Sequence, residues 1–215
     1  MSFDYASLVT REAQYYPQAF NPGILSITDV ENYLNNHRYL HEELKVIRPT
    51  TQATDHYSSI HQPWRNAYDP ATMEMLWNNG YAFILHSPYV SERVKNIVKW
   101  IELKNDVSCD AHVYMGRADS KSFPPHCDHS YNLIVQCAGE THWRVWDIIT
   151  EPQDFEHLSY DPYIDVVMSP GDAIIIPRGQ VHQAVALTDR MSVSFPFYPG
   201  PKTIQRDIQL NWSQP

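Results

Sequence analysis

The sequence predicts a mainly β fold, in which helices of the N-terminal half pack on an antiparallel jelly-roll barrel. From Ala111 onward, apolar residues recur with a period of two in short segments separated by turn residues, whereas helical spacing occurs only before that point. The 215 residues, 43% of them hydrophobic, are enough for one core, and no linker divides them. We therefore expect a single domain over residues 1–215, comprising a helical and loop elaboration (1–109), the barrel core (110–198) and a C-terminal tail (199–215).

The first helical pattern begins near residue 28. Thr28 and Glu31 have the spacing of a capping box, and apolar residues then recur at helical intervals, so we expect a helix over residues 29–44. Residues 46–68 lack any period and contain prolines, polar residues and aromatics, which predicts a long loop. Two roles are open for this loop, a lip that binds substrate or a cover over one face of a sheet. The side chains that favour a lip are His56, Tyr57, His61, Trp64 and Tyr68.

Two further helices are expected before the barrel. Asp69, followed by a proline, is an N-cap signal and Gly80 is a stop signal, which predicts a helix over 70–79 and then a strand over 81–86. Apolar residues at intervals of three and four next predict an amphipathic helix, with its charged side chains on the solvent side. The apolar residues that define this helix are Val90, Val94, Ile97, Val98 and Ile101.

The barrel core is predicted from segments in which apolar and polar residues alternate. Such segments, with turn residues between them, are typical of a closed or double-sheet antiparallel structure such as a jelly roll. The expected strands cover residues 110–116, 122–128, 131–137, 142–147, 164–168, 173–177, 182–187 and 191–197.

The charge and the apolar runs of the chain exclude several classes of function. Lys and Arg number 16 against 25 Asp and Glu, a net charge of -9, so we expect neither general nucleic-acid binding nor binding to anionic membranes. The longest apolar runs are strand-sized, and Asp4, Arg11 and Glu12 interrupt the region of a signal peptide, so we expect a soluble cytoplasmic protein without a transmembrane segment. The three cysteines form no C-x-x-C pair, which argues against disulfides and structural zinc.

Two histidines and one carboxylate are the candidates for a metal site. His126 and Asp128 are two residues apart in an expected strand, so both side chains lie on one face. The run from Gly171 to His182 places turn residues on both sides of a strand and brings His182 to the start of the next one. These ligands leave three positions of an octahedral ion open, as a non-haem Fe(II) centre needs in order to bind a co-substrate and O2. A structural barrel without metal is the alternative.

Three motifs follow one another in the C-terminal half. They are Pro-Pro-His-Cys-Asp at 124–128, Gly-Glu-Thr-His-Trp-Arg-Val-Trp at 139–146 and the run at 171–182. With these motifs, residues 110–198 resemble the cupin superfamily and, within it, the JmjC-like 2-oxoglutarate and Fe(II)-dependent hydroxylases. The resemblance implies a double-stranded β-helix, the cupin-like barrel, with Fe(II) as metal and 2-oxoglutarate and O2 as co-substrates. It does not extend to the N-terminal half.

The resemblance also implies a binding site for the co-substrate. Asn132 corresponds to a residue beside the co-substrate, and Tyr114 corresponds to a tyrosine that contacts its distal carboxylate. The basic residue that normally anchors this carboxylate falls on Thr141, which carries no charge. The family pattern therefore breaks at this position.

A different cation is available on the last expected strand. Arg190 and Ser192 look like the Arg-x-Ser pair of other branches of the same superfamily, and a guanidinium holds a carboxylate through two parallel hydrogen bonds. Strand alternation places both side chains on one face and their apolar neighbours on the other. We expect Arg190 to be the anchor, because alternation turns the other candidates, His142 and Arg144, away from Thr141.

The expected function is that of a 2-oxoglutarate-dependent dioxygenase that hydroxylates a C–H bond, or demethylates by the same chemistry. The alternative is a metal-binding cupin without 2-oxoglutarate, acting as a direct dioxygenase, an isomerase or a non-catalytic binding barrel. Thr141 favours this alternative, whereas Arg190 and Asn132 oppose it. The acidic charge suits a basic protein or peptide as substrate, and a small molecule fits the same residues. The resemblance leaves a homodimer open, since members of the family often dimerise through their terminal helices.

Overall fold

The structure is a computed structural model, and it describes residues 8–36, 43–47, 54–56, 69–118, 120, 123–151, 153–155 and 158–199. The helices and strands are, in chain order, β1 (Gln14–Tyr16), η2 (Pro22–Ile24), α1 (Ile27–Asn36), β2 (Leu44–Ile47), β3 (Thr54–His56), α3 (Pro70–Asn78), β4 (Ala82–His86), α4 (Glu92–Asn105), β5 (Val107–Cys109), β6 (His112–Gly116), β7 (Tyr131–Ala138), β8 (Thr141–Ile149), β9 (Ile164–Met168), β10 (Ala173–Ile176), β11 (Gln180–Ala186) and β12 (Arg190–Pro199). The expected tail beyond residue 199 lies outside the described residues.

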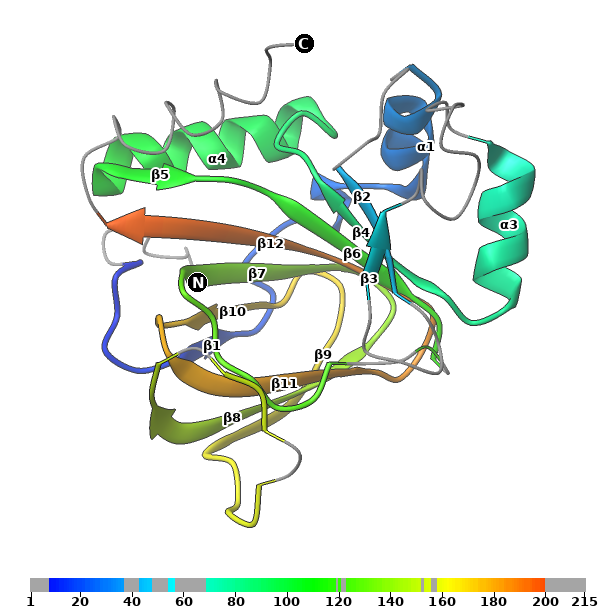
Figure 1. Cartoon of the computed structure of the whole chain (residues 1–215). Coiled ribbons are helices and arrows are strands. Elements are labelled where there is room, and N and C mark those ends of the chain that lie inside the picture. Colours follow the sequence, from blue (N-terminus) through cyan, green and yellow to red (C-terminus); the bar gives the residue numbers. More distant parts are fainter. Residues whose placement is uncertain are drawn as a thin grey trace, which may run out of the picture.

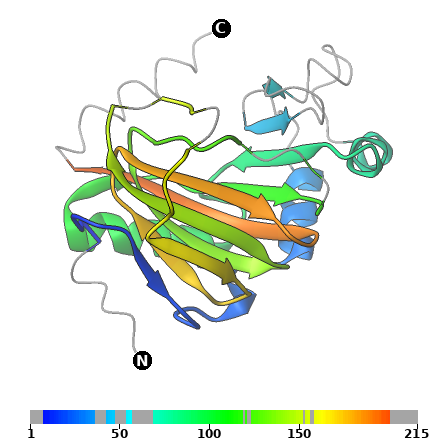
Figure 2. The same ribbon diagram turned by 90° about the horizontal axis from the view of Figure 1, so that it is seen from below.

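Two antiparallel sheets face each other and form the barrel (Figure 1). The larger sheet has the strand order β1-β10-β7-β12-β6-β4-β2-β3, with β5 also paired to β12, and the smaller sheet has the order β11-β8-β9. Figure 2 shows the strands of the two sheets stacked over one another, seen from below. Helix α4 lies across the larger sheet on the side away from the smaller one (Figure 1). This arrangement confirms the predicted mainly β jelly roll with N-terminal helices.

The strand β12 has two faces of opposite character, as its alternation predicted. On the face toward the helices, its apolar side chains join the main core with those of α4. The buried members of this core from the two elements are Met191, Val193, Phe195 and Phe197 of β12 and Val94, Val98 and Ile101 of α4. On the face toward the smaller sheet, Arg190, Ser192 and Ser194 line a cavity. One strand therefore separates the hydrophobic core from the cavity.

The expected helix over 29–44 is wrong at both ends. The helix α1 begins at Ile27, where the Ser26 backbone N–H and hydroxyl bind the Asp29 carboxylate, and the Asp29 N–H donates to the Ser26 hydroxyl, so this pair forms the cap in place of the predicted one. Leu44 belongs to β2, where it pairs with Leu85 of β4. This pairing with a distant strand overrides the local helical spacing. Residues 37–42 lie outside the described residues.

The expected loop over 46–68 is also interrupted by strands. Its first residues belong to β2, and β3 pairs with β2 in antiparallel register. The remaining part of this segment, including four of the five side chains that favoured a lip, lies outside the described residues. The choice between a lip and a cover therefore stays open.

The other expected elements before the barrel are confirmed. The Asp69 carboxylate accepts a hydrogen bond from the Thr72 N–H at the start of α3, and Gly80 adopts a φ of 77° just after this helix. The Ser91 hydroxyl caps α4 by accepting from the Val94 N–H at 3.2 Å.

In the barrel, strands β7 to β12 match their expected bounds to within two residues. None of the helices in the described ranges combines the length and apolar character needed to cross a bilayer.

The expected strand over 122–128 is wrong. Within its described residues, 123–128, the chain makes only isolated bridges, in which His126 lies opposite His182 and Asp154. The bridge to His182 consists of two backbone hydrogen bonds, of 3.0 and 2.8 Å, that the two residues exchange. Pro124 and Pro125 have no N–H to extend this ladder, which explains why the pairing stops there.

Asp172 ties the N-terminal strand to the barrel. Its carboxylate is 4% exposed and accepts hydrogen bonds from the Tyr15 hydroxyl (2.9 Å), from the Gln18 N–H (2.8 Å) and side-chain amide (3.1 Å), and from the Ser169 N–H (2.9 Å). Burial, with the neighbouring carboxylate, raises the pKa of Tyr15 to about 12, so this hydroxyl stays a donor at neutral pH. Asp172 therefore has a structural role in holding β1 against β10.

We expect Asp172→Ala to lower the free energy of unfolding by about 2–4 kcal/mol, because several hydrogen bonds to a buried carboxylate are lost together. Urea unfolding measures this change as a lower midpoint at unchanged slope. The exposed Asp161 provides the matched control, and Asp161→Ala should stay within about 0.5 kcal/mol of the wild type. Equal stability of the two variants contradicts the anchoring role of Asp172.

Candidate metal centre

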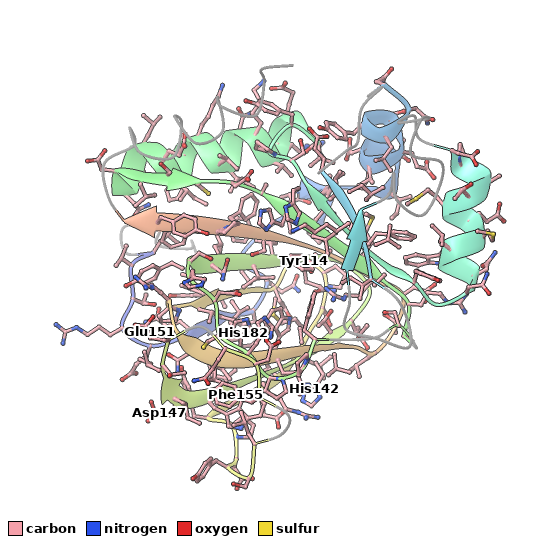
Figure 3. The ribbon with its side chains drawn as sticks, viewed as in Figure 1. Tyr114, His142, Asp147, Glu151, Phe155 and His182 are labelled. Carbon is pink, nitrogen blue, oxygen red and sulfur yellow. The ribbon has the colours of Figure 1, made fainter. Side chains whose placement is uncertain are left out.

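A cavity of about 300 Å³ lies between the two sheets. The larger sheet lines it with side chains from β6, β7 and β12, and the smaller sheet with side chains from β8 and β11. Figure 3 labels one side chain of each wall, Tyr114 of β6 and His182 of β11. The sequence-predicted site residues that line the cavity are Tyr114, His126, Asp128, Asn132, His182, Arg190 and Ser192.

The three predicted metal ligands meet at one place in this cavity. Donor atoms of His126, Asp128 and His182 all lie within 4.8 Å of one another, and among the described residues only these three form such a group. The Asp128 carboxylate oxygens lie 3.9 Å from Nε2 of His126 and 3.6 Å from Nε2 of His182. Two neutral imidazoles and one carboxylate form a donor set suited to a divalent transition metal.

Backbone carbonyls set the tautomer of both histidines. Nδ1 of His126 donates to the Pro124 carbonyl and Nδ1 of His182 donates to the Gln180 carbonyl, each at 2.9 Å. The proton is therefore on Nδ1, and the lone pair of Nε2 points toward Asp128. Burial, with the nearby His126 ring, lowers the pKa of His182 below its ordinary value, which keeps this imidazole neutral. The residues present thus fit a metal ion.

Asn132 holds the carboxylate of Asp128 in place. Its Nδ2 donates to Asp128 Oδ2 at 2.8 Å, and its Oδ1 accepts from the hydroxyls of Ser130 and Ser194, both at 3.3 Å. These contacts fix the direction of the amide, so its N–H side faces the carboxylate. Asn132 was expected beside a co-substrate, and in the structure it also positions a candidate ligand.

The turn before β11 brings His182 to the site. The Gly179 N–H donates to the Asp128 carbonyl at 3.0 Å, which joins this turn to the other ligand segment. Gly179 has a φ of 78°, and a Cβ atom there would lie 2.5 Å from the Thr150 carbonyl oxygen. Both features require glycine, which explains the glycine at position 179 of this turn.

Arg190 is a cation without a counter-ion in the described part of the chain. Its Nη1 donates to the Ser192 hydroxyl at 3.0 Å, and its Nε is buried without a hydrogen-bond partner. Burial lowers the pKa of Arg190 to about 10, so the guanidinium stays charged at neutral pH. Burial also raises the pKa of Tyr114, whose hydroxyl remains a neutral donor in the same cavity. Arg190 thus supplies the positive charge of the cavity, and Tyr114 supplies a neutral hydrogen-bond donor.

Thr141 and its neighbours are arranged as strand alternation predicts. Thr141 is fully buried, and its hydroxyl has no hydrogen-bond partner, but the residue does not line the cavity. His142 and Arg144 lie on the opposite face of β8, where His142 binds Asp165 and accepts from Arg144 Nη2 at 3.5 Å. Neither side chain is directed at Thr141.

The remaining histidines of the barrel stay outside the ligand group. His129 is exposed and does not line the cavity. His112 shares a face with Tyr114 but does not line the cavity, and its ring stacks on His86 with 4.0 Å between centroids.

Trp143 and Asp154 also line the cavity, and neither was predicted as a site residue. Strand alternation from Thr141 places Trp143 on the inner face of β8, a signal that also fits simple packing. No sequence signal was available for Asp154, because it lies in an irregular segment that reaches the site through backbone hydrogen bonds to the segment of His126.

Comparisons with known proteins agree with this fold. The JmjC domain family matches residues 85–203, more than half of the chain. "Ribosomal oxygenase 1" of Danio rerio is 26% identical over 197 residues, which cover 86% of this chain and 35% of that protein. "Bifunctional lysine-specific demethylase and histidyl-hydroxylase NO66" of Drosophila persimilis is 35% identical over 89 residues, 39% of this chain and 13% of that protein.

Solved structures share the fold over most of this chain. YcfD, a ribosomal oxygenase from Escherichia coli solved in complex with cobalt and 2-oxoglutarate, superposes with a TM-score of 0.61 at 15% identity, covering 94% of this chain and 52% of that one. The same protein with cobalt and succinic acid gives a TM-score of 0.63 at 16% identity. This chain thus spans about a third of the length of the Danio rerio relative and half that of the solved structures.

We expect the free energy of unfolding of the metal-free protein to fall as the pH is lowered from about 7.5 to 5. The folded state favours neutral His182, whereas the unfolded chain protonates this residue near pH 6.5, so the unfolded state binds more protons in this window. Urea unfolding in the presence of a chelator measures the effect. His182→Gln, which has no titrating ring, should lose less stability over the same range, and an equal loss contradicts this assignment.

Proposed function

The chain belongs to the JmjC domain family, and from this membership and the geometry of the cavity we propose that it is a 2-oxoglutarate- and Fe(II)-dependent oxygenase. The reaction is hydroxylation of a C–H bond, or demethylation by the same chemistry. One observation carries the proposal: a charged guanidinium without a carboxylate partner among the described residues shares a cavity with two histidines and an aspartate at ligand spacing. Such a cavity suits a ligand that binds a metal at one end and carries a carboxylate at the other.

His126, Asp128 and His182 are the proposed ligands of Fe(II). With three ligands from the protein, the ion would keep room for the co-substrate and O2. When bound, the ion supplies the oxidation, in which one O2 converts 2-oxoglutarate to succinate and CO2 and places its second oxygen atom in the substrate C–H bond. Backbone contacts of the Nδ1 atoms leave Nε2 of both imidazoles free to bind the ion. Asn132 keeps the carboxylate directed at the ion.

Arg190 is the proposed anchor for the distal carboxylate of 2-oxoglutarate. The Ser192 hydroxyl holds one side of the guanidinium and leaves Nε free to donate into the cavity. The Tyr114 hydroxyl can donate to the same carboxylate, because burial keeps it protonated. The Arg190 guanidinium on β12 thereby takes the role of the family's basic residue, whose position in this chain is occupied by Thr141. The pairing of two buried opposite charges stabilises the bound state, because an unpaired guanidinium is costly in the empty cavity.

The substrate that we propose is a basic protein or peptide. One relative is named a ribosomal oxygenase, and the other a lysine demethylase and histidyl hydroxylase. These names refer to the substrates of those two proteins. The net charge of -9 favours a cationic partner here as well. The carboxylate of Asp154 lies at the exposed side of the cavity, where it meets such a side chain first. A small-molecule substrate is the alternative, and turnover assays with basic peptides against metabolites separate the two.

The single domain over residues 1–215 and the homodimer also stay predictions. Light scattering of the purified chain tests the homodimer, and a single cooperative unfolding transition tests the single domain.

We expect anaerobic addition of Fe(II) and 2-oxoglutarate to produce a visible charge-transfer band, and air then to produce succinate. Replacing His182 by Ala removes one of three ligands and should abolish the band and at least about 90% of succinate formation. His142→Ala removes a histidine from the outer face of β8 and serves as the control, with the band retained. Absence of both the band and succinate in the wild type would rule out this function.

We expect Arg190→Met to raise the 2-oxoglutarate concentration needed for half-maximal binding by about 10- to 100-fold, because charge-assisted hydrogen bonds to the distal carboxylate are lost. Calorimetric titration of the Mn(II)-loaded protein measures this change without turnover. Arg144→Met, on the outer face of β8, is the matched control and should leave the affinity unchanged. No change in the Arg190 variant favours the metal-binding cupin without 2-oxoglutarate.

A further inference from the structure

Asp154 lies directly beside one of the proposed metal ligands. Two backbone hydrogen bonds, of 3.2 and 2.7 Å, join residues 153–155 to residues 125–127 on either side of the pair formed by His126 and Asp154. The side chains of such a pair project from the same face of the backbone, with Cβ atoms about 5 Å apart. On its other side, His126 exchanges two backbone hydrogen bonds with His182. All three side chains therefore project from one face, and all three residues line the cavity.

The carboxylate of Asp154 is accessible and unpaired. Asp154 is exposed while it lines the cavity, and its carboxylate has no hydrogen-bond or ion-pair partner in the described part of the chain. It also lies outside the group of three candidate metal ligands. Arg178, on the turn before β11, pairs with Glu151 at 3.7 Å. The Asp154 carboxylate is thus available to a group that enters the cavity.

The charges of the filled cavity indicate that this group is a cation. Three of the described residues that line the cavity have charged side chains, Asp128, Asp154 and Arg190. In the proposed function, the charges of a divalent ion and Arg190 cancel those of Asp128 and 2-oxoglutarate. Asp154 then remains as the uncompensated charge. Opposite charges attract more strongly in a protein cavity than in bulk water, so a substrate group with one positive charge completes the balance.

The cavity also offers a surface for the apolar part of such a side chain. The Phe123 ring lies beside His126, with 5.7 Å between centroids, and both residues line the cavity. Lys and Arg side chains combine an apolar stem with a charged head, and an aromatic ring contacts both parts favourably. A carboxylate and an aromatic ring next to the same imidazole therefore match a Lys or Arg side chain.

We propose that Asp154 is a specificity-determining residue, whose carboxylate binds the charged head of a Lys or Arg side chain, so that the residue to be oxidised is itself cationic. This inference rests on the proposed function and adds to it the site of charge recognition, which lies beside His126 inside the cavity. A neutral target residue within a basic sequence would complement the net charge of the protein but would leave Asp154 unpaired.

Paramagnetic broadening tests which side chains enter the cavity. The Mn(II)-loaded protein with 2-oxoglutarate, kept under nitrogen, broadens the proton resonances of a peptide that binds near the ion. The probes are acetylated and amidated tripeptides with arginine, lysine or the neutral arginine analogue citrulline between two glycines. We expect the side-chain resonances of the arginine and lysine peptides to broaden about three- to tenfold more than those of the citrulline peptide.

Two variants assign this preference to one carboxylate. Asp154→Asn retains the shape of the side chain without its charge, and should reduce the broadening of the cationic peptides to that of the citrulline peptide. Glu151→Gln removes the same charge from the same loop and should keep the preference, because Glu151 is exposed and does not line the cavity. Calorimetric binding of 2-oxoglutarate shows that both variants are folded.

Equal broadening of the arginine and citrulline peptides by the wild type, or a preference that survives in Asp154→Asn, overturns this inference. So does a histidine peptide of the same design, mostly neutral at pH 8, that broadens more than both cationic peptides. In these cases the wild type still binds 2-oxoglutarate, and the proposed function stands. Failure of the Mn(II)-loaded wild type to bind 2-oxoglutarate overturns the proposed function, and this inference with it.

Discussion

The reciprocal backbone hydrogen bonds between His126 and His182 are the constraint on which the site depends. They join two segments that lie far apart in the chain and fix both Cα atoms relative to each other. Each ring is then oriented by a carbonyl two residues earlier in its own segment. The convergence of the two Nε2 atoms on Asp128 therefore begins with the pairing of the backbone.

The strand β12 shows how one element builds both stability and a binding site. Its apolar residues complete the core against α4, and its polar residues face the smaller sheet. A guanidinium on that inner face is destabilising when the cavity holds no anion and stabilising when it does. The rigid core behind the strand keeps this charge in place, so the cavity is organised before a ligand arrives.

Local patterns predicted those elements that local forces decide. The cap of α3 at Asp69 and the amphipathic face of α4 need only a few neighbouring residues, and both were recognised. The strand at Leu44 was not, because its partner β4 lies about forty residues away and competes with helical spacing. The segment over 122–128 shows the opposite error, since alternation is present but its prolines remove the donors that a strand needs.

The sequence alone determined the barrel, its two-faced last strand and the three side chains at ligand spacing, because alternation and turn residues are encoded over a few positions. Only the tertiary structure decided that Asp172 secures β1 and that Asp154 lies opposite His126 and borders the cavity. Each of these depends on which atoms from distant segments come within 3 or 4 Å. Periodicity along one chain segment carries no information about such distances.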